Sequence, residues 1–285
     1  HMIDRVYMGV DWRRDHSFRI PRPDLSLETD SPNACTDCHA DQSSTWAAEA
    51  LERWYPEREN RGPHYGQVLA AGRANPVSAK GDLADLAENT GQPGIVRATA
   101  LWLLEQAEDP ALATRLEPML DDPDPVVRAA ATGLHLSAAP ALRAQRLERA
   151  LEDPLRTVRI EAAKTMISVP PNAMSPSATQ KLRAAAREWQ QGLVNRADFP
   201  ETHLILGGTA LTMRNLASAE RAFREVVRMD PQREDAWVML ARIADATQGP
   251  AAAAQVAQQA LQFLPGSDTL NQMAGTESLL PPPRE

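Results

Sequence analysis

Apolar and small residues in the middle of the chain recur with a helical spacing. The dipeptide Val-Arg returns every 31 residues, and an Ala follows each Val four positions later. The three dipeptides are Val96-Arg97, Val127-Arg128 and Val158-Arg159. Residues four apart lie on one helix face, and small side chains let helices cross closely. Asp-Pro pairs separate the repeats and favour helix starts, because Asp caps a helix and Pro fits its first position. The pattern therefore predicts helix pairs across residues 76–170.

A second periodic region covers residues 200–265. Pro231 and Pro265 are 34 positions apart, and so are His203 and Trp237. The other matching positions are Leu206, Gly207, Ala210, Ala219 and Phe223 in the first repeat, and Leu240, Ala241, Ala244, Ala253 and Ala257 in the second. This period matches the tetratricopeptide pattern, and the upstream spacing resembles short HEAT-type repeats. We therefore expect an all-α chain whose larger part is an α-solenoid of stacked helix pairs.

These patterns divide the chain into three predicted segments. Residues 1–75 are rich in Pro and charge and show few regular periods. Residues 76–170 carry the HEAT-like repeats, and residues 171–285 carry the tetratricopeptide repeats with a C-terminal tail. The boundary between the two repeat regions is the proline-rich stretch 170–176, which breaks regular structure. A helix is expected after it, over residues 177–194.

One helix is predicted inside the first segment. Asp41 is the expected N-cap, and Trp46, Ala50 and Trp54 fall on one helical face. This face packs either on a bound cofactor or on the remainder of its own domain, and the pattern leaves both interpretations open.

Composition narrows the classes of partner. The chain has 285 residues, a formal net charge of −8 and 5% aromatic residues. No basic run stands out, so neither nucleic acid nor an anionic membrane is an expected partner. No stretch of apolar residues is long enough for a membrane-spanning helix.

The candidate chemistry lies in the pentapeptide Cys35-Thr36-Asp37-Cys38-His39, which contains both cysteines of the chain. C-x-x-C-H is the signature of covalent c-type haem attachment. Each thiol can form a thioether with one haem vinyl group, and His39 can ligate the iron. Haem c is therefore the expected cofactor, with Cys35, Cys38 and His39 as its binding residues.

Three other interpretations of the same residues remain open. A thioredoxin-like dithiol would need a βαβ context, which the flanking sequence does not indicate. A zinc site would need further ligands, such as one distant histidine. The two cysteines could also form a small disulfide ring.

The sequence around the pentapeptide resembles a known family. The block Tyr7-Met8-Gly9-Val10-Asp11 continues through Arg13-Arg14-Asp15-His16-Ser17-Phe18, and Pro32-Asn33-Ala34 leads into Cys35. This order resembles that of bacterial multihaem c-type cytochromes with C-terminal tetratricopeptide repeats, closely over residues 1–75 and by architecture beyond. The resemblance implies further haem motifs upstream, so that this chain is a C-terminal fragment. His1-Met2 is then either a cloning remnant or the end of a lost haem motif.

The second axial ligand of the iron is expected among the nearby histidines. His64 is favoured because it follows the aromatic helix and can fold back over a haem. His16 is the alternative, since it precedes the pentapeptide in a charged segment. Neighbouring arginines could pair with haem propionates or simply be solvated. These candidates are Arg13, Arg14, Arg19 and Arg22.

The resulting expectation is an electron-transfer module rather than a catalyst. Covalent haem attachment places the native protein in the periplasm or outside the cell. Its partner would be a redox protein or neighbouring haem domains of the parent chain, docked on the repeats. The alternatives are a fragment of a multihaem oxidoreductase with its catalytic haem upstream, or a repeat scaffold without haem.

Overall fold

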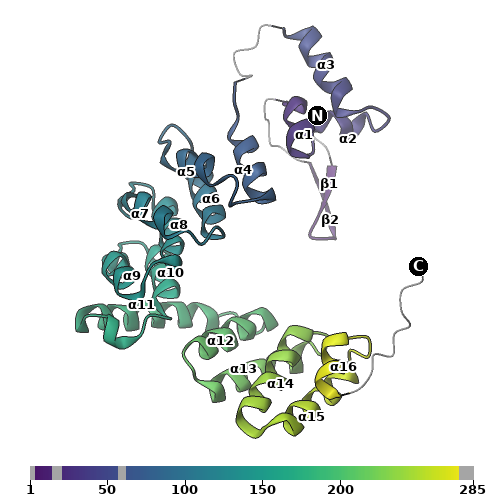
Figure 1. Cartoon of the computed structure of the whole chain (residues 1–285). Helices are drawn as coiled ribbons and strands as arrows, with labels where there is room; N and C mark the ends of the chain where they lie inside the picture. The colour runs from purple at the N-terminus through teal and green to yellow at the C-terminus, as the bar shows by residue number, and fades with distance from the viewer. Residues whose placement is uncertain (1–3, 15–20, 57–61, 276–285) are drawn as a thin grey trace. The chain divides into compact units, whose positions relative to one another are not determined.

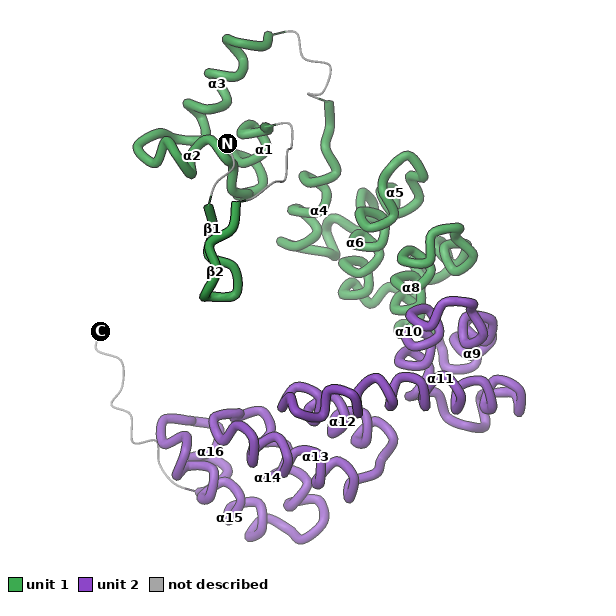
Figure 2. Tube along the Cα trace, turned by 180° about the vertical axis from the view of Figure 1, so that it is seen from behind, with its two compact units in different colours: residues 1–138 green, residues 139–285 purple. Residues whose placement is uncertain are grey.

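The computed structural model describes residues 4–14, 21–56 and 62–275, and it confirms that the chain is all-α. Over these ranges the chain forms sixteen α-helices, four short 3-10 helices and one two-stranded sheet (Figure 1). It divides into two compact units, residues 1–138 and 139–285 (Figure 2). The three segments predicted from sequence, residues 1–75, 76–170 and 171–285, are defined by sequence patterns, whereas the two units are defined by contacts. The segments therefore stay predictions.

The first unit begins with a hairpin and continues with eight helices. Its elements are β1 (Asp4–Tyr7), β2 (Asp11–Arg14), α1 (Pro23–Thr29), α2 (Ala34–Cys38), α3 (Ser44–Trp54), α4 (Tyr65–Ala74), α5 (Lys80–Glu88), α6 (Gly94–Glu105), α7 (Pro110–Arg115), η1 (Glu117–Asp121), α8 (Pro125–Leu134) and η2 (His135–Ser137).

The hairpin β1–β2 is an element that the sequence pattern did not predict. The strands pair antiparallel with Asp4 opposite Arg14 and Tyr7 opposite Asp11. The chain reverses at Met8 and Gly9, which both have positive φ. Glycine favours this left-handed region because it lacks a Cβ atom.

The core of the first unit lies in α4 to α8. Its buried apolar residues run from Leu69 to Leu134. Helix α4 approaches this core closely at Gly72, where an added Cβ atom would lie 2.9 Å from the Leu83 side chain. The last helix of the predicted N-terminal segment therefore packs with the helices that follow it.

The Val-Arg dipeptides of the repeat pattern have a structural role. Arg128 Nη1 donates to the carbonyl oxygens of Asp122 and Pro123, at 2.8 and 3.3 Å. In the second unit, 31 residues further along, Arg159 Nη1 donates to the carbonyl oxygens of Asp153 and Pro154, at 2.7 and 3.0 Å. The same side chain thus closes the same Asp-Pro turn in both places.

Arg97, at the equivalent position in the first repeat, makes a different contact. Its guanidinium forms a buried ion pair with Asp122, with Nη2 and Oδ2 2.5 Å apart. Its Nε also donates to the carbonyl oxygen of Ala87 at 2.8 Å. Arg97 therefore joins α6 to α5 and to the turn before α8.

The second unit consists of helices alone within the ranges described. Its elements are α9 (Pro140–Leu147), η3 (Ala150–Glu152), α10 (Arg156–Met166), η4 (Pro171–Ala173), α11 (Pro176–Val194), α12 (Pro200–Thr212), α13 (Leu216–Met229), α14 (Glu234–Gln248), α15 (Pro250–Leu261) and α16 (Asp268–Ala274). The helix predicted over residues 177–194 is confirmed as α11.

Helices α12 to α16 share one apolar core, which runs from Ala210 to Ala274. Gly207 of α12 lies against the ring of Phe223 on α13, where an added Cβ atom would come within 2.7 Å. Trp237 of α14 donates from Nε1 to the carbonyl oxygen of Pro231 at 3.0 Å and stacks on Phe263. Gly207, Phe223 and Trp237, which belong to the 34-residue pattern, are therefore packing residues. No helix of the described ranges is both long and apolar enough to cross a lipid bilayer.

Candidate functional site

Cys35, Cys38 and His39 lie on one turn of helix. Both cysteines belong to α2, and His39 is its C-cap residue, with its backbone amide donating to the carbonyl oxygen of Cys35 at 2.9 Å. Residues at positions i, i+3 and i+4 of a helix lie on the same face. Both thiols are free, Cys35 is half-buried, and Cys38 and His39 are exposed. The two thiols and the imidazole are therefore directed to one side of the turn.

Asn33 begins this helix, and the sequence interpretation did not assign it a function. Its side-chain Oδ1 accepts hydrogen bonds from the backbone amides of Cys35 at 3.1 Å and Thr36 at 3.2 Å. These amides have no partner inside the helix, which is why a polar N-cap residue stabilises it. Asn directly before a short helical segment is the sequence signal that indicates this role.

The aromatic helix after the pentapeptide is α3, and its N-cap differs from the prediction. Ser43 caps α3, with its hydroxyl accepting from the Trp46 amide at 3.1 Å, so the assignment of Asp41 was wrong. Ala50 is buried as expected, but Trp54 is 66% exposed. The ring of Trp46 lies 5.0 Å from that of His39, so α3 contributes one wall next to the imidazole.

His64 lies at the N-terminus of α4, where it acts as a helix cap. Its Nδ1 accepts from the Gly66 amide at 3.0 Å, and its own amide donates to the Gln67 side chain at 2.9 Å. Helix α1 contacts both α3 and α4, and it lies between α2 and α4 in both views (Figures 1 and 2). The structure thus brings Cys35, Cys38 and His39 together, while His64 bonds to Gly66 and Gln67 of its own helix.

The electrostatic surroundings of His64 favour its neutral form. Partial burial is the main cause that lowers the pKa of His64, and the Arg22 guanidinium lowers it further, whereas Asp24 opposes the change. A neutral imidazole is the form that accepts a hydrogen bond through Nδ1, as the cap requires. His16, the other predicted axial ligand, lies outside the described residues.

The arginines considered for haem propionates pair with nearby carboxylates. Arg13 lies 2.7 Å from Asp11, and Arg22 lies 2.8 Å from Asp24. Arg14 faces Asp4 across the hairpin, with 3.5 Å between Nε and Oδ1. Arg19 lies outside the described residues.

The region around the pentapeptide has a thin apolar core. Between residues 4 and 56 as described, the buried apolar side chains are Leu25, Ala47, Ala50 and Leu51. The same region holds eight of the twenty exposed large apolar side chains found in the described chain. A large planar cofactor that binds beside this small core would bury part of the exposed apolar surface, and this burial is favourable. Free thiols and an imidazole on one face, next to such a surface, fit a haem group.

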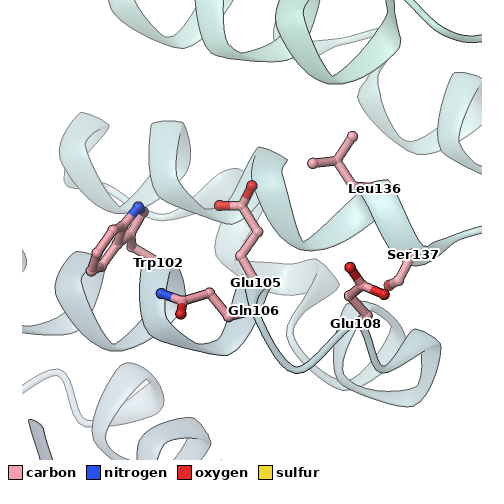
Figure 3. Close-up of a pocket in the computed structure, with 6 residues that line it drawn as sticks. All are labelled: Trp102, Glu105, Gln106, Glu108, Leu136 and Ser137. Carbon is pink, nitrogen blue, oxygen red and sulfur yellow. The ribbon is translucent and has the colours of Figure 1, made fainter. Parts of the chain in front are cut away.

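Two other features of the described residues bear on ligand binding. No group of three or more His, Cys, Asp or Glu side chains is arranged there to hold a metal ion. A surface cavity of about 670 Å³ lies between α6 and η2 in the first unit (Figure 3). It is lined by Trp102, Glu105, Gln106, Glu108, Leu136 and Ser137.

Comparison of the chain with models of protein families, with curated proteins and with solved structures found no match.

Proposed function

We propose that the chain is a c-type cytochrome module of the periplasm or cell exterior, which transfers single electrons through one covalently attached haem. The observation that carries the proposal is the placement of Cys35, Cys38 and His39 on one face of a capped helical turn. A disulfide or a dithiol would need only the two cysteines, whereas haem attachment also uses the adjacent histidine.

Each residue of the pentapeptide has a distinct role in this proposal. Cys35 and Cys38 hold the haem covalently, and His39 is the proximal ligand. The ring of Trp46 lies 5.0 Å from that of His39, so it is the nearest aromatic side chain to the proposed proximal ligand among the ring contacts of the described residues. Bound haem supplies an iron that accepts and returns one electron, and the protein supplies its ligands and its burial.

The helical repeats are proposed to form a solenoid that docks the redox partner. The recurring bonds of Arg128 and Arg159 at Asp-Pro turns support HEAT-like repeats, and the Gly207–Phe223 contact supports tetratricopeptide repeats. Residues 76–138 carry ten acidic and four basic side chains. Because complementary charge guides association, we expect the docking face of the partner to be basic, whether it is a separate protein or a haem domain of a longer parent chain.

A redox titration of the haem-loaded protein tests this function. We expect one Soret-absorbing centre that is reduced and reoxidised reversibly in a single one-electron step. Electron exchange with a basic redox protein should slow as salt is raised, because salt screens charge attraction. Turnover of a substrate at this haem would favour the oxidoreductase alternative instead. If the protein takes up no haem when it is made with attachment machinery, the result would favour the alternative of a repeat scaffold without haem.

A further inference from the structure

Asn33 does more than cap α2. While its Oδ1 accepts from the two amides of α2, its Nδ2 donates to the hydroxyl of Ser26 on α1 at 3.3 Å and to that of Ser44 on α3 at 3.1 Å. Ser26 is buried and Ser44 is half-buried. One side chain therefore joins the turn that bears the pentapeptide to the two helices beside it.

The chemistry of these partners fixes the orientation of the Asn33 amide. Backbone amides can only donate, so the oxygen of Asn33 must face Cys35 and Thr36. The NH₂ group then faces the two serines, whose hydroxyls can accept. Two accepted and two donated hydrogen bonds use both halves of the amide, and another residue of similar size would not provide both.

Helix α2 depends on such support because it has only five residues. A helix this short is not stable by itself in water, since the cost of its first turn is spread over few hydrogen bonds. Without the cap, Cys35, Cys38 and His39 would occupy one face for only part of the time. Attachment at both thiols requires them to face the same haem together.

We propose that Asn33 is a positioning residue for covalent haem attachment. Its oxygen holds the Cys35–His39 turn in helical form, and its NH₂ group docks that turn on α1 and α3. This inference rests on the proposed function, because it assigns Asn33 a role in attaching the same haem.

Three changes separate the two parts of this role. Asn33→Ala removes both, while Asn33→Asp keeps the accepting oxygen and loses the donor group. The double variant Ser26→Ala/Ser44→Ala removes the acceptors on α1 and α3 and leaves the cap intact. Asn215→Ala is the matched control, since Asn215 caps α13 by accepting from the Ser218 amide at 3.1 Å, far along the chain from the pentapeptide.

The first measurement is the haem-attached fraction, read from intact mass after co-production with haem-attachment machinery. We expect the haem-attached fraction to fall about fivefold in Asn33→Ala. Loss of one N-cap lowers the helical population of α2 by about this factor. Asn33→Asp and the double serine variant should give intermediate fractions, and Asn215→Ala should match the wild type.

The second measurement is hydrogen exchange at the Cys35 and Thr36 amides without haem. Exchange should speed up in Asn33→Ala and stay slow in Asn33→Asp, which a general loss of stability would not produce. Equal haem-attached fractions in the wild type and Asn33→Ala would overturn the inference alone. Equal exchange rates in these two proteins would overturn it as well. A wild type that takes up no haem would overturn the proposed function, and the inference with it.

Discussion

His64, the favoured candidate for the second axial ligand, caps a helix in the structure, and its role as a ligand stays a prediction. Its Nδ1 caps α4, and this contact requires the neutral ring. This cap was not predictable from sequence, because Asn, Ser, Thr and Asp are the usual N-cap residues. Cys35, Cys38 and His39 were predictable because their spacing is local, and one helical turn is enough to bring them together.

The lowered pKa of His64 predicts a pH dependence of stability. Near its usual pKa of 6.5, the folded protein binds fewer protons at this ring than the unfolded chain does, so stability rises with pH. The contribution of His64 is present above that value and is lost as the pH falls below it. Thermal unfolding at about pH 7.5 and about pH 5.5 measures this loss.

His64→Asn is the matched variant for this prediction, because Asn can also cap α4 but does not titrate. Its melting temperature should fall less on acidification than that of the wild type. An equal fall in both proteins would contradict a neutral His64 cap.

At the scale of elements, the sequence predicted helices in the regions where apolar and small residues recur at a fixed spacing. Helix α11 was predicted after the proline-rich stretch 170–176, and the packing positions of α12 to α15 were predicted because they recur every 34 residues. The hairpin β1–β2 was missed because its strands have four residues each and its described side chains are exposed, which leaves no apolar alternation to recognise. The N-cap of α3 was misplaced because Asp41 and Ser43 are both good caps, and local sequence does not choose between them.

Adjacent glycines of α12 test how tightly α12 and α13 pack. Gly207 faces the buried Phe223 ring, whereas Gly208 has no atom within 4 Å of an added Cβ. Both changes to Ala gain the same helix propensity, about 1 kcal/mol, because Ala is the better helix former. Only Gly207→Ala meets a packed ring, which costs about 1–3 kcal/mol.

We therefore expect Gly207→Ala to be less stable than Gly208→Ala by that packing cost. Urea unfolding of the two variants measures the difference. Equal stabilities would mean that α12 and α13 do not pack as closely as described.

At the scale of the whole chain, apolar burial is unevenly distributed. The two large cores lie at residues 69–134 and 210–274, and the pentapeptide lies outside both. Sequence patterns could predict the cores because they come from repeated helices. They could not predict how the N-terminal region packs, because its contacts depend on single polar side chains such as Asn33.

This distribution predicts that haem attachment stabilises the N-terminal region most. A ligand that binds only the folded form adds to its stability, and regions with little core open most easily. Limited proteolysis of the haem-free protein should cut first within residues 21–56. The haem-loaded protein should resist at these sites, while cleavage in α12 to α16 should be unchanged. Equal cleavage in both forms would show that haem does not stabilise residues 21–56.

The intact mass of the protein made in the presence of haem-attachment machinery decides whether Cys35 and Cys38 carry a haem. We expect a mass increase of one haem, a Soret band that survives denaturation, and loss of both in Cys35→Ser/Cys38→Ser. An unmodified wild-type mass without a Soret band would contradict this expectation, and so would haem that the double cysteine variant still retains covalently.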